Sequence, residues 1–337
     1  MSSAADRAVA HVRGRAAAAP GPAGLFDTAR ITVSFHPDRL LADGRSVADH
    51  LAAEGRYRSQ FETGISGGGL TAHPGGDRDR WEHRMFGGAY AGAVVDRPVY
   101  GGLDLAGHVD GASPRFGSCY LLLDASVLVR ATFSHGDSAT EPTVVGTADT
   151  FGAIWAALLD QVARTGTALG VAAAGPRQWA AALAAPRTAA GRALDDYVEA
   201  QVHGGLDLGA DVTAVVADPS FRGTRTAASL ASWAPRLEWH PGFVLGAGEF
   251  PAGMRGPAAP RLAAHLAGVY GTDHLDAALI GRAAAVVTEP GRWAAYGTAA
   301  EVLQQLKYLW HILVRFGHPV TPGTAPAPRA RPRTRRG

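Results

Sequence analysis

An acidic residue, Glu199, lies inside the strand-like run Tyr197-Val-Glu-Ala-Gln-Val202. Acidic side chains are poor strand formers and are costly to bury without a partner, so such a residue usually has a function. Two earlier residues are candidate partners: His36, at the end of an alternating run, and Tyr90, in a Gly-rich segment. A fixed carboxylate stabilises the oxocarbenium-like cation that forms when a glycosidic bond breaks. We therefore expect a site for glycosidic cleavage, with Glu249 as the alternative acid.

A second motif, Gly64-Ile-Ser-Gly-Gly68, matches the G-x-S-x-G pattern of a serine nucleophile. That pattern requires an apolar strand before the serine and a helix after it, whereas a polar run precedes this one and Thr71-Ala-His-Pro74 follows it. A flexible glycine loop is the favoured interpretation, and a hydrolase that uses Ser66 is the alternative. The chain has no phosphate-loop pattern and no H-E-x-x-H motif, so we expect no metal.

Composition narrows the class of protein. The chain has 337 residues, 47% of them apolar, and a net charge of +2, which gives no strong field for nucleic acid. The single cysteine, Cys119, excludes an internal disulfide and a thiolate zinc cage. We expect a cytoplasmic protein without a signal peptide or a membrane span.

The hydrophobic pattern predicts an α+β fold. Residues 1–24 are expected to form a short helix and a linker, residues 25–250 the main α+β domain, and residues 255–318 a C-terminal helical subdomain. The Arg- and Pro-rich tail, residues 319–337, is expected to be disordered. Residues 299–316 carry a broad apolar stripe, which predicts core or interface packing. A non-catalytic module that docks a partner through this stripe stays open as an alternative.

The layout of the chain resembles the ADP-ribosyltransferase superfamily of the His-Tyr-Glu type. The resemblance covers residues 30–245, and the segments that carry it are Ser34-Phe-His36, Ile65-Ser-Gly-Gly-Gly-Leu70, Phe86-Gly-Gly-Ala-Tyr-Ala91 and Val198-Glu-Ala-Gln-Val202. It implies a split mixed β-sheet with flanking helices and NAD as the substrate. Glu199 would then orient the ribose and stabilise the cation. Tyr197 occupies the position at which arginine-specific members carry an acidic or amide residue, which leaves the acceptor open.

The same resemblance assigns the remaining NAD contacts. His36 and Tyr90 would hold NAD, with Tyr90 stacked on the nicotinamide, and the loop that contains Gly68 and Gly69 would grip its carboxamide. Guanidinium groups bind phosphate oxygens well, so Arg39 and Arg58 would pair with the pyrophosphate. Gln201, two residues after Glu199, is a further contact candidate. The acceptor would be a protein or a nucleic acid.

A more specific resemblance is to a bacterial family known as domain-of-unknown-function family 3626. The segments that carry it span nearly the whole chain: Phe35-His-Pro-Asp-Arg39, Tyr57-Arg-Ser-Gln-Phe-Glu-Thr-Gly64, Trp81-Glu-His-Arg84, Pro114-Arg-Phe-Gly117, Tyr197-Val-Glu-Ala-Gln-Val-His-Gly204, Trp239-His-Pro-Gly242 and Leu306-Lys-Tyr-Leu-Trp-His311. This resemblance implies kinship and leaves the activity open.

Overall fold

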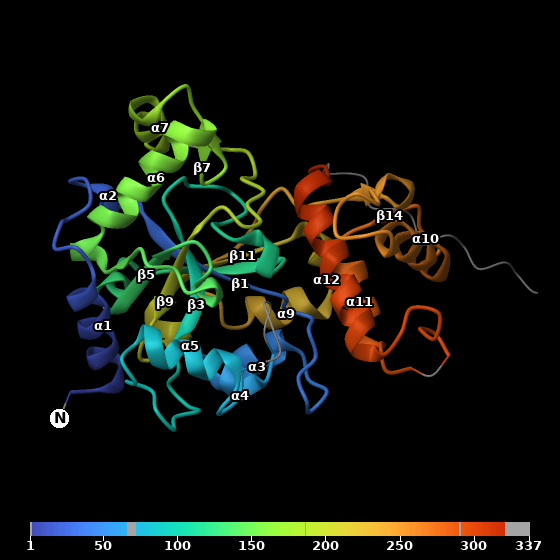
Figure 1. Cartoon of the computed structure of the whole chain (residues 1–337). Coiled ribbons are helices and arrows are strands. Elements are labelled where there is room, and N and C mark those ends of the chain that lie inside the picture. The colour runs from blue at the N-terminus through green and yellow to red at the C-terminus, as the bar shows by residue number, and fades with distance from the viewer. Residues whose placement is uncertain (1, 66–71, 186, 290, 321–337) are drawn as a thin grey trace, which may run out of the picture.

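A mixed eight-stranded sheet forms the centre of the computed structural model, which describes residues 2–65, 72–185, 187–289 and 291–320 (Figure 1). In spatial order its strands are β12 (Leu237–Trp239), β11 (Val212–Ala217), β4 (Cys119–Leu123), β1 (Arg30–Phe35), β3 (Val99–Asp104), β9 (Val198–Val202), β5 (Ala131–His135) and β6 (Val145–Gly146). Only the β11–β12 pair among these is parallel. Two-stranded ladders join β2 (Arg56–Tyr57) to β10 (Leu206–Asp207), β7 (Thr167–Ala168) to β8 (Val171–Ala172), and β13 (Leu245–Gly246) to β14 (His274–Leu275).

Helices surround this sheet. They are α1 (Ala4–Arg15), α2 (Leu25–Thr28), α3 (Val47–Glu54), α4 (Gln60–Thr63), α5 (Asp77–Met85), α6 (Gly152–Thr165), α7 (Pro176–Leu183), α8 (Leu208–Asp211), α9 (Arg225–Ala231), α10 (Ala258–Tyr270), α11 (Ala277–Ala285) and α12 (Ala299–Phe316). In Figure 1, α6 and α7 lie above the sheet, α3, α4 and α5 lie below it, and α10, α11 and α12 form a group at its right-hand end. The α+β class is thus confirmed; a transferase-specific core stays a prediction.

Along each central strand, successive side chains point to opposite faces of the sheet, and the two faces differ in chemistry. Thr32 pairs with Gly102, which pairs with Glu199, which in turn pairs with Ser134. Residues opposite one another in a sheet point to the same face, so these positions form one row on one face. Sequence neighbours on the other face, such as Ile31, Phe133 and Val198, are apolar. One face of the sheet is therefore polar although it is buried.

The segment between β3 and β4 covers part of this polar face. The backbone N–H of Ala112 donates to Thr32 Oγ1 (3.1 Å), and the Oγ atoms of Ser113 and Ser34 lie 3.5 Å apart. Gly117 crosses so close to β1 that a Cβ atom there would lie 2.1 Å from the backbone nitrogen of Phe35. Only glycine permits this close approach beside the end of β1.

The C-terminal helices share the core of the sheet. Leu262 of α10, Leu279 of α11 and Trp310 of α12 belong to the same buried cluster as the apolar side chains of the central strands. The indole N–H of Trp310 donates to the carbonyl of Pro114 (2.8 Å), and Val244 bridges to His318. The apolar stripe of α12 is therefore packed inside the molecule.

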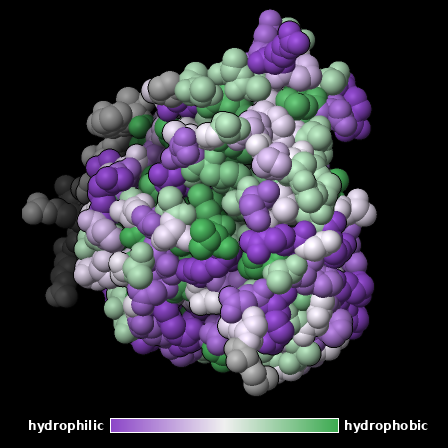
Figure 2. Space-filling model, turned by 90° about the vertical axis from the view of Figure 1, so that its left-hand side faces the viewer, coloured by the Kyte–Doolittle hydropathy of each residue, from purple (hydrophilic) through white to green (hydrophobic). Residues whose placement is uncertain are grey.

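On the side of α1 and α2, Figure 2 shows hydrophilic side chains around a central band of hydrophobic ones.

Candidate functional site

A cavity of about 490 Å³ lies at the end of β1, on the polar face of the sheet. Strands β1, β3 and β9 form one side of it, helices α3, α4 and α5 a second, and helices α11 and α12 a third. Its polar and aromatic lining includes Ser34, His36, Asp38, Arg39, His50, Glu54, Arg56, Tyr57, Arg58, Asp77, Arg78, Trp81, Tyr100, Ser113, Arg115, Phe116, Asp137, Glu199, Lys307 and Trp310. Both His36 and Glu199, which are 163 positions apart in the chain, thus line one cavity.

Glu199 is only 5% exposed, yet it reaches this cavity. Burial, and then the charge of Asp137, raises the pKa of Glu199 to about 7. Hydrogen bonds to its carboxylate oppose this shift: Gln201 Nε2 donates to Oε1 (2.9 Å), while Tyr197 Oη and the backbone N–H of Ser138 each donate to Oε2 (3.4 Å). A carboxyl group with a pKa near 7 can exchange a proton or ionise in response to a ligand at neutral pH.

His36 follows the last residue of β1 and is neutral at pH 7. Burial, and then the charge of Arg39, lowers the pKa of His36 to about 4. Its Nδ1 lies 3.3 Å from Ser118 Oγ, and its ring meets the edge of Trp310 at 5.5 Å between centroids. A neutral imidazole offers one donor and one acceptor, so His36 can bind a hydroxyl group.

A chain of hydrogen bonds runs behind Glu199 through the polar face. The hydroxyl of Thr132 donates to Gln201 Oε1 (2.7 Å) and accepts from His203 Nε2 (2.9 Å). His203 Nδ1 must then accept from Tyr90 Oη, at 2.7 Å, because burial lowers the pKa of His203 to about 3 and keeps its ring neutral. Every donor in the chain therefore points toward Glu199. The chain holds the carboxylate in place.

Tyr90 does not line the cavity, which corrects the expectation that it stacks on a ligand. The side chain is 3% exposed and packs against Phe86 and Met85 in a separate apolar cluster under α1. Its ring lies parallel to that of His203 with 5.9 Å between centroids. Gln201 is also fully buried, so its contact is with Glu199 rather than with the cavity.

The two arginines expected at phosphates both line the cavity but are differently engaged. Arg58 donates from Nε to Glu54 Oε2 (2.8 Å) and from Nη2 to Oε1 of the same carboxylate, so its fork is occupied. Arg39 lies beside Asp38, whose pKa burial raises to about 7. Glu249 lies elsewhere: it is exposed and accepts from the backbone N–H of Gly246 (2.7 Å). Ser66, Gly68 and Gly69 lie outside the described residues.

Sequence reasoning missed several residues that the cavity contains. The guanidinium of Arg78 lies 5.0 Å from the centroid of Trp81 and 4.7 Å from that of Tyr100. Its Nη1 is buried and has no hydrogen-bond partner among the described residues. Lys307, the only lysine of the chain, and Arg115 line the opposite part of the cavity. The only feature of the sequence that could have pointed to Lys307 is that it is the sole lysine. The arginines and aromatic residues of the cavity have no distinguishing pattern in the sequence.

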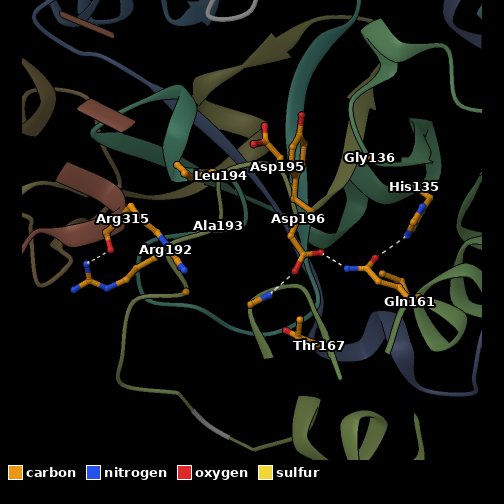
Figure 3. Close-up of a pocket in the computed structure, with 14 residues that line it drawn as sticks. His135, Gly136, Gln161, Thr167, Arg192, Ala193, Leu194, Asp195, Asp196 and Arg315 are labelled. Atoms are coloured by element: carbon orange, nitrogen blue, oxygen red, sulfur yellow. Dashed lines mark hydrogen bonds between the residues drawn. The ribbon is translucent and has the colours of Figure 1, made fainter. Parts of the chain in front are cut away.

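A second hollow of about 590 Å³ opens beside the start of β9 (Figure 3). Its polar groups are already paired with one another: Asp196 accepts from Gln161 Nε2 (2.8 Å) and from the backbone N–H of Gly170 (3.0 Å). Arg192 donates to the carbonyls of Val314 (3.2 Å) and Arg315 (3.4 Å). Because these groups are satisfied, this hollow offers a ligand fewer free contacts than the cavity at β1.

Within residues 2–65, 72–185, 187–289 and 291–320, no cluster of three or more His, Cys, Asp or Glu side chains could hold a metal ion. In the same part of the chain, no helix has the length and apolarity needed to span a membrane.

The fold and the cavity define an α+β protein that buries a polar, carboxylate-containing site. The model of the family described as "Protein of unknown function (DUF3626)" matches residues 30–316, so the chain belongs to this family. The match contains the cavity-lining residues from His36 to Trp310. No curated protein matches the sequence significantly.

Proposed function

We propose that the protein is an NAD-dependent ADP-ribosyltransferase-like enzyme, which cleaves the bond between nicotinamide and ribose. The observation that carries this proposal is the presence of Glu199 and His36 in one cavity lined by cations and aromatic rings. The acceptor of ADP-ribose is expected to be a protein or a nucleic acid of the cytoplasm.

Glu199 has the chemistry that the reaction needs. As the nicotinamide leaves, positive charge develops on the ribose, and an ionised carboxylate nearby stabilises it. Free Glu199, with a pKa of about 7, is partly protonated at neutral pH. A substrate that brings a positive charge favours the ionised form, so binding and ionisation are coupled. Gln201 keeps the carboxylate oriented through its 2.9 Å hydrogen bond.

His36 and the aromatic residues supply the binding contacts. The neutral ring of His36 is suited to a ribose hydroxyl, because it can donate or accept without adding a charge. Trp81 and Tyr100, both in the cavity wall, take over the stacking role first expected of Tyr90. A flat ring such as nicotinamide or adenine can pack on such side chains.

The test is the release of nicotinamide from NAD by purified protein, wild type against Glu199→Gln. We expect the substitution to lower turnover by about 100-fold, as for loss of one group that stabilises transition-state charge. Glutamine keeps the size and can still accept from Tyr197 and Ser138, but its amide then faces the Gln201 Nε2 donor, so the folded state of the variant is checked by urea denaturation alongside turnover.

Glu249→Gln is the matched control, since Glu249 is exposed and outside the cavity, and its turnover should equal that of wild type. Absence of nicotinamide release by wild type under all acceptors and pH values tried, or equal turnover of Glu199→Gln, would overturn the proposal.

A further inference from the structure

Lys307 lies half-buried on α12 and lines the cavity. No described residue forms a hydrogen bond or an ion pair with its ammonium group. Burial, and then the charges of Arg115 and Arg255, lowers the pKa of Lys307, and Asp137 opposes them weakly. A partly buried cation among other cations is unfavourable unless an anion compensates it. Among the described residues, the carboxylate that acts on Lys307 is Asp137, and Asp137 is already paired with Arg115.

The packing of α12 brings Lys307 to Arg115. Trp310 follows Lys307 by one helical turn, so both side chains project from the same face of α12. The indole of Trp310 is fixed to the carbonyl of Pro114, the residue before Arg115. Lys307 and Arg115 therefore line the same part of the cavity, held by a buried contact between two distant segments.

Arg115 is only partly satisfied by the chain. Its Nη1 pairs with Asp195 and donates to the carbonyl of Leu194 (3.3 Å), and its Nη2 pairs with Asp137 at 3.5 Å. Its Nε is buried and lacks a hydrogen-bond partner among the described residues. His311, one turn after Lys307, is 2% exposed, and both of its ring nitrogens likewise lack described partners. Polar atoms without a hydrogen-bond partner among the described residues thus gather in this corner of the molecule.

Three other acidic residues of the cavity, Glu54, Asp77 and Asp137, are paired with cations, whereas Asp38 and Glu199 form no ion pair among the described residues. Glu54 is held by both arms of Arg58, and Asp77 is paired with Arg80. Asp137 is shared with Arg115. Guanidinium and ammonium groups together match the several oxygens of a phosphate. A phosphate group would therefore supply the anionic partner that Lys307 lacks.

We propose that Lys307 and Arg115 bind the pyrophosphate of a nucleotide at the α12 end of the cavity. This inference rests on the proposed function for its choice of a nucleotide. The position is suitable, because Asp137 beside Arg115 adjoins Ser138, whose backbone N–H donates to Glu199. A dinucleotide can then place its phosphates at α12 and a ribose at Glu199. The C-terminal helices are thereby part of the substrate site.

Because Lys307 is the only lysine of the chain, chemical labelling of its amine tests the proposed anion site directly. Pyridoxal 5′-phosphate carries an aldehyde and a phosphate; a lysine amine condenses with the aldehyde, water leaves, and borohydride reduces the imine to a stable amine. In the full chain only Lys307 and the terminal α-amino group can react. We expect the phosphate compound to label Lys307 at about tenfold lower concentration than pyridoxal, with inorganic pyrophosphate protecting Lys307 alone. Mass spectrometry locates the label.

Arg115→Gln should abolish most of the preference for the phosphate compound, while the α-amino group, labelled equally by both reagents, serves as the internal control. Equal labelling of Lys307 by the two reagents, or labelling that pyrophosphate does not reduce, would overturn the inference. Protection by pyrophosphate without nicotinamide release supports the anion site and counts against the NAD reaction. Nicotinamide release that is unchanged in Lys307→Met counts against the anion site alone.

Discussion

The two faces of the central sheet are equally buried but opposite in chemistry. The apolar face carries Ile31, Val33, Phe133, Val198 and Ala200, each 1% exposed or less, whereas the polar face carries Thr32, Thr132, Ser134, Glu199, Gln201 and His203, each 5% exposed or less. Side chains of one strand thus enter two different environments at alternate positions. The apolar face therefore stabilises the fold, whereas the polar face positions the side chains of the candidate site.

Burial of apolar groups stabilises the fold, whereas burial of polar groups costs free energy unless hydrogen bonds compensate. On the polar face, Thr132, Gln201 and His203 satisfy one another and end at Glu199. Such a network adds little net stability compared with an apolar core, so its value lies in fixing the carboxylate. Stability and function are therefore expected to respond to substitutions on opposite faces.

The largest effect is expected from Phe133→Ala on the apolar face. Phe133 is fully buried and packs edge-to-face on Phe151 with 5.7 Å between ring centroids. Removing the ring leaves a cavity and should lower the free energy of unfolding by about 3–5 kcal/mol. Thr132→Val, one residue earlier on the polar face, removes a hydroxyl at constant shape and should cost about 1–3 kcal/mol. Urea denaturation measures both, and a larger loss for Thr132→Val would reverse the roles of the two faces.

An intermediate effect is expected from Glu199→Gln on stability as a function of pH. The folded-state pKa of about 7 lies above the ordinary glutamate value of 4.5, so the folded protein holds this proton more tightly than the unfolded chain does. The contribution of Glu199 to stability is then complete below pH 4.5 and is lost as the pH rises through 7. Glutamine stays neutral, so the variant should become more stable relative to wild type by on the order of 2 kcal/mol between pH 5 and pH 8.

Thermal or urea unfolding of the two proteins across this pH range provides the measurement. Asp38, whose pKa is also raised to about 7 by burial, is present in both proteins and cancels in the difference. If the difference in stability between the two proteins stays constant from pH 5 to pH 8, Glu199 is solvated like an ordinary glutamate. The polar face would then not raise the pKa of this carboxyl group.

The sequence alone predicted much of this fold. The alternating run from Ile31 to Phe35 forms the central strand β1, and the apolar stripe predicted for residues 299–316 forms α12 with the same bounds. Local patterns suffice for such elements, because the hydrophobic period reports the buried face. The apolar residues Val127, Leu128 and Val129 do not form a strand: Ala125–Arg130 is a 3₁₀ turn, which Asp124 caps by accepting from the N–H of Ser126 (2.9 Å). A short polar cap overrode strand propensity there.

The site was predictable only where strand position determined it. His36 and Glu199 lie at or beside strands that share β3 as a neighbour, so the two predicted residues line one cavity. Tyr90 lies outside the cavity because it packs in a cluster with residues of α1. No local sequence pattern indicates this long-range contact. Lys307 reaches the cavity because α12 docks on Pro114, a contact between segments nearly 200 positions apart.

The smallest effect is expected from Tyr90→Phe, at the far end of the hydrogen-bond chain. The substitution removes the donor to His203 Nδ1 while it keeps the ring that packs on Phe86. We expect the free energy of unfolding to fall by about 1 kcal/mol, because one buried acceptor loses its partner. The KM for NAD should stay the same, since the tyrosine does not line the cavity. Denaturation and nicotinamide-release kinetics on the same preparation give both quantities.

Tyr100→Phe is the matched comparison, because Tyr100 carries a partly buried hydroxyl, which donates to Glu82 Oε1 (2.7 Å), but its ring lines the cavity. A similar loss of stability in both variants, with a change in KM only for Tyr100→Phe, agrees with the arrangement described here. A raised KM in Tyr90→Phe without a loss of stability would instead place Tyr90 against the substrate, as the sequence first indicated. The two tyrosines thus separate support of the carboxylate from contact with the ligand.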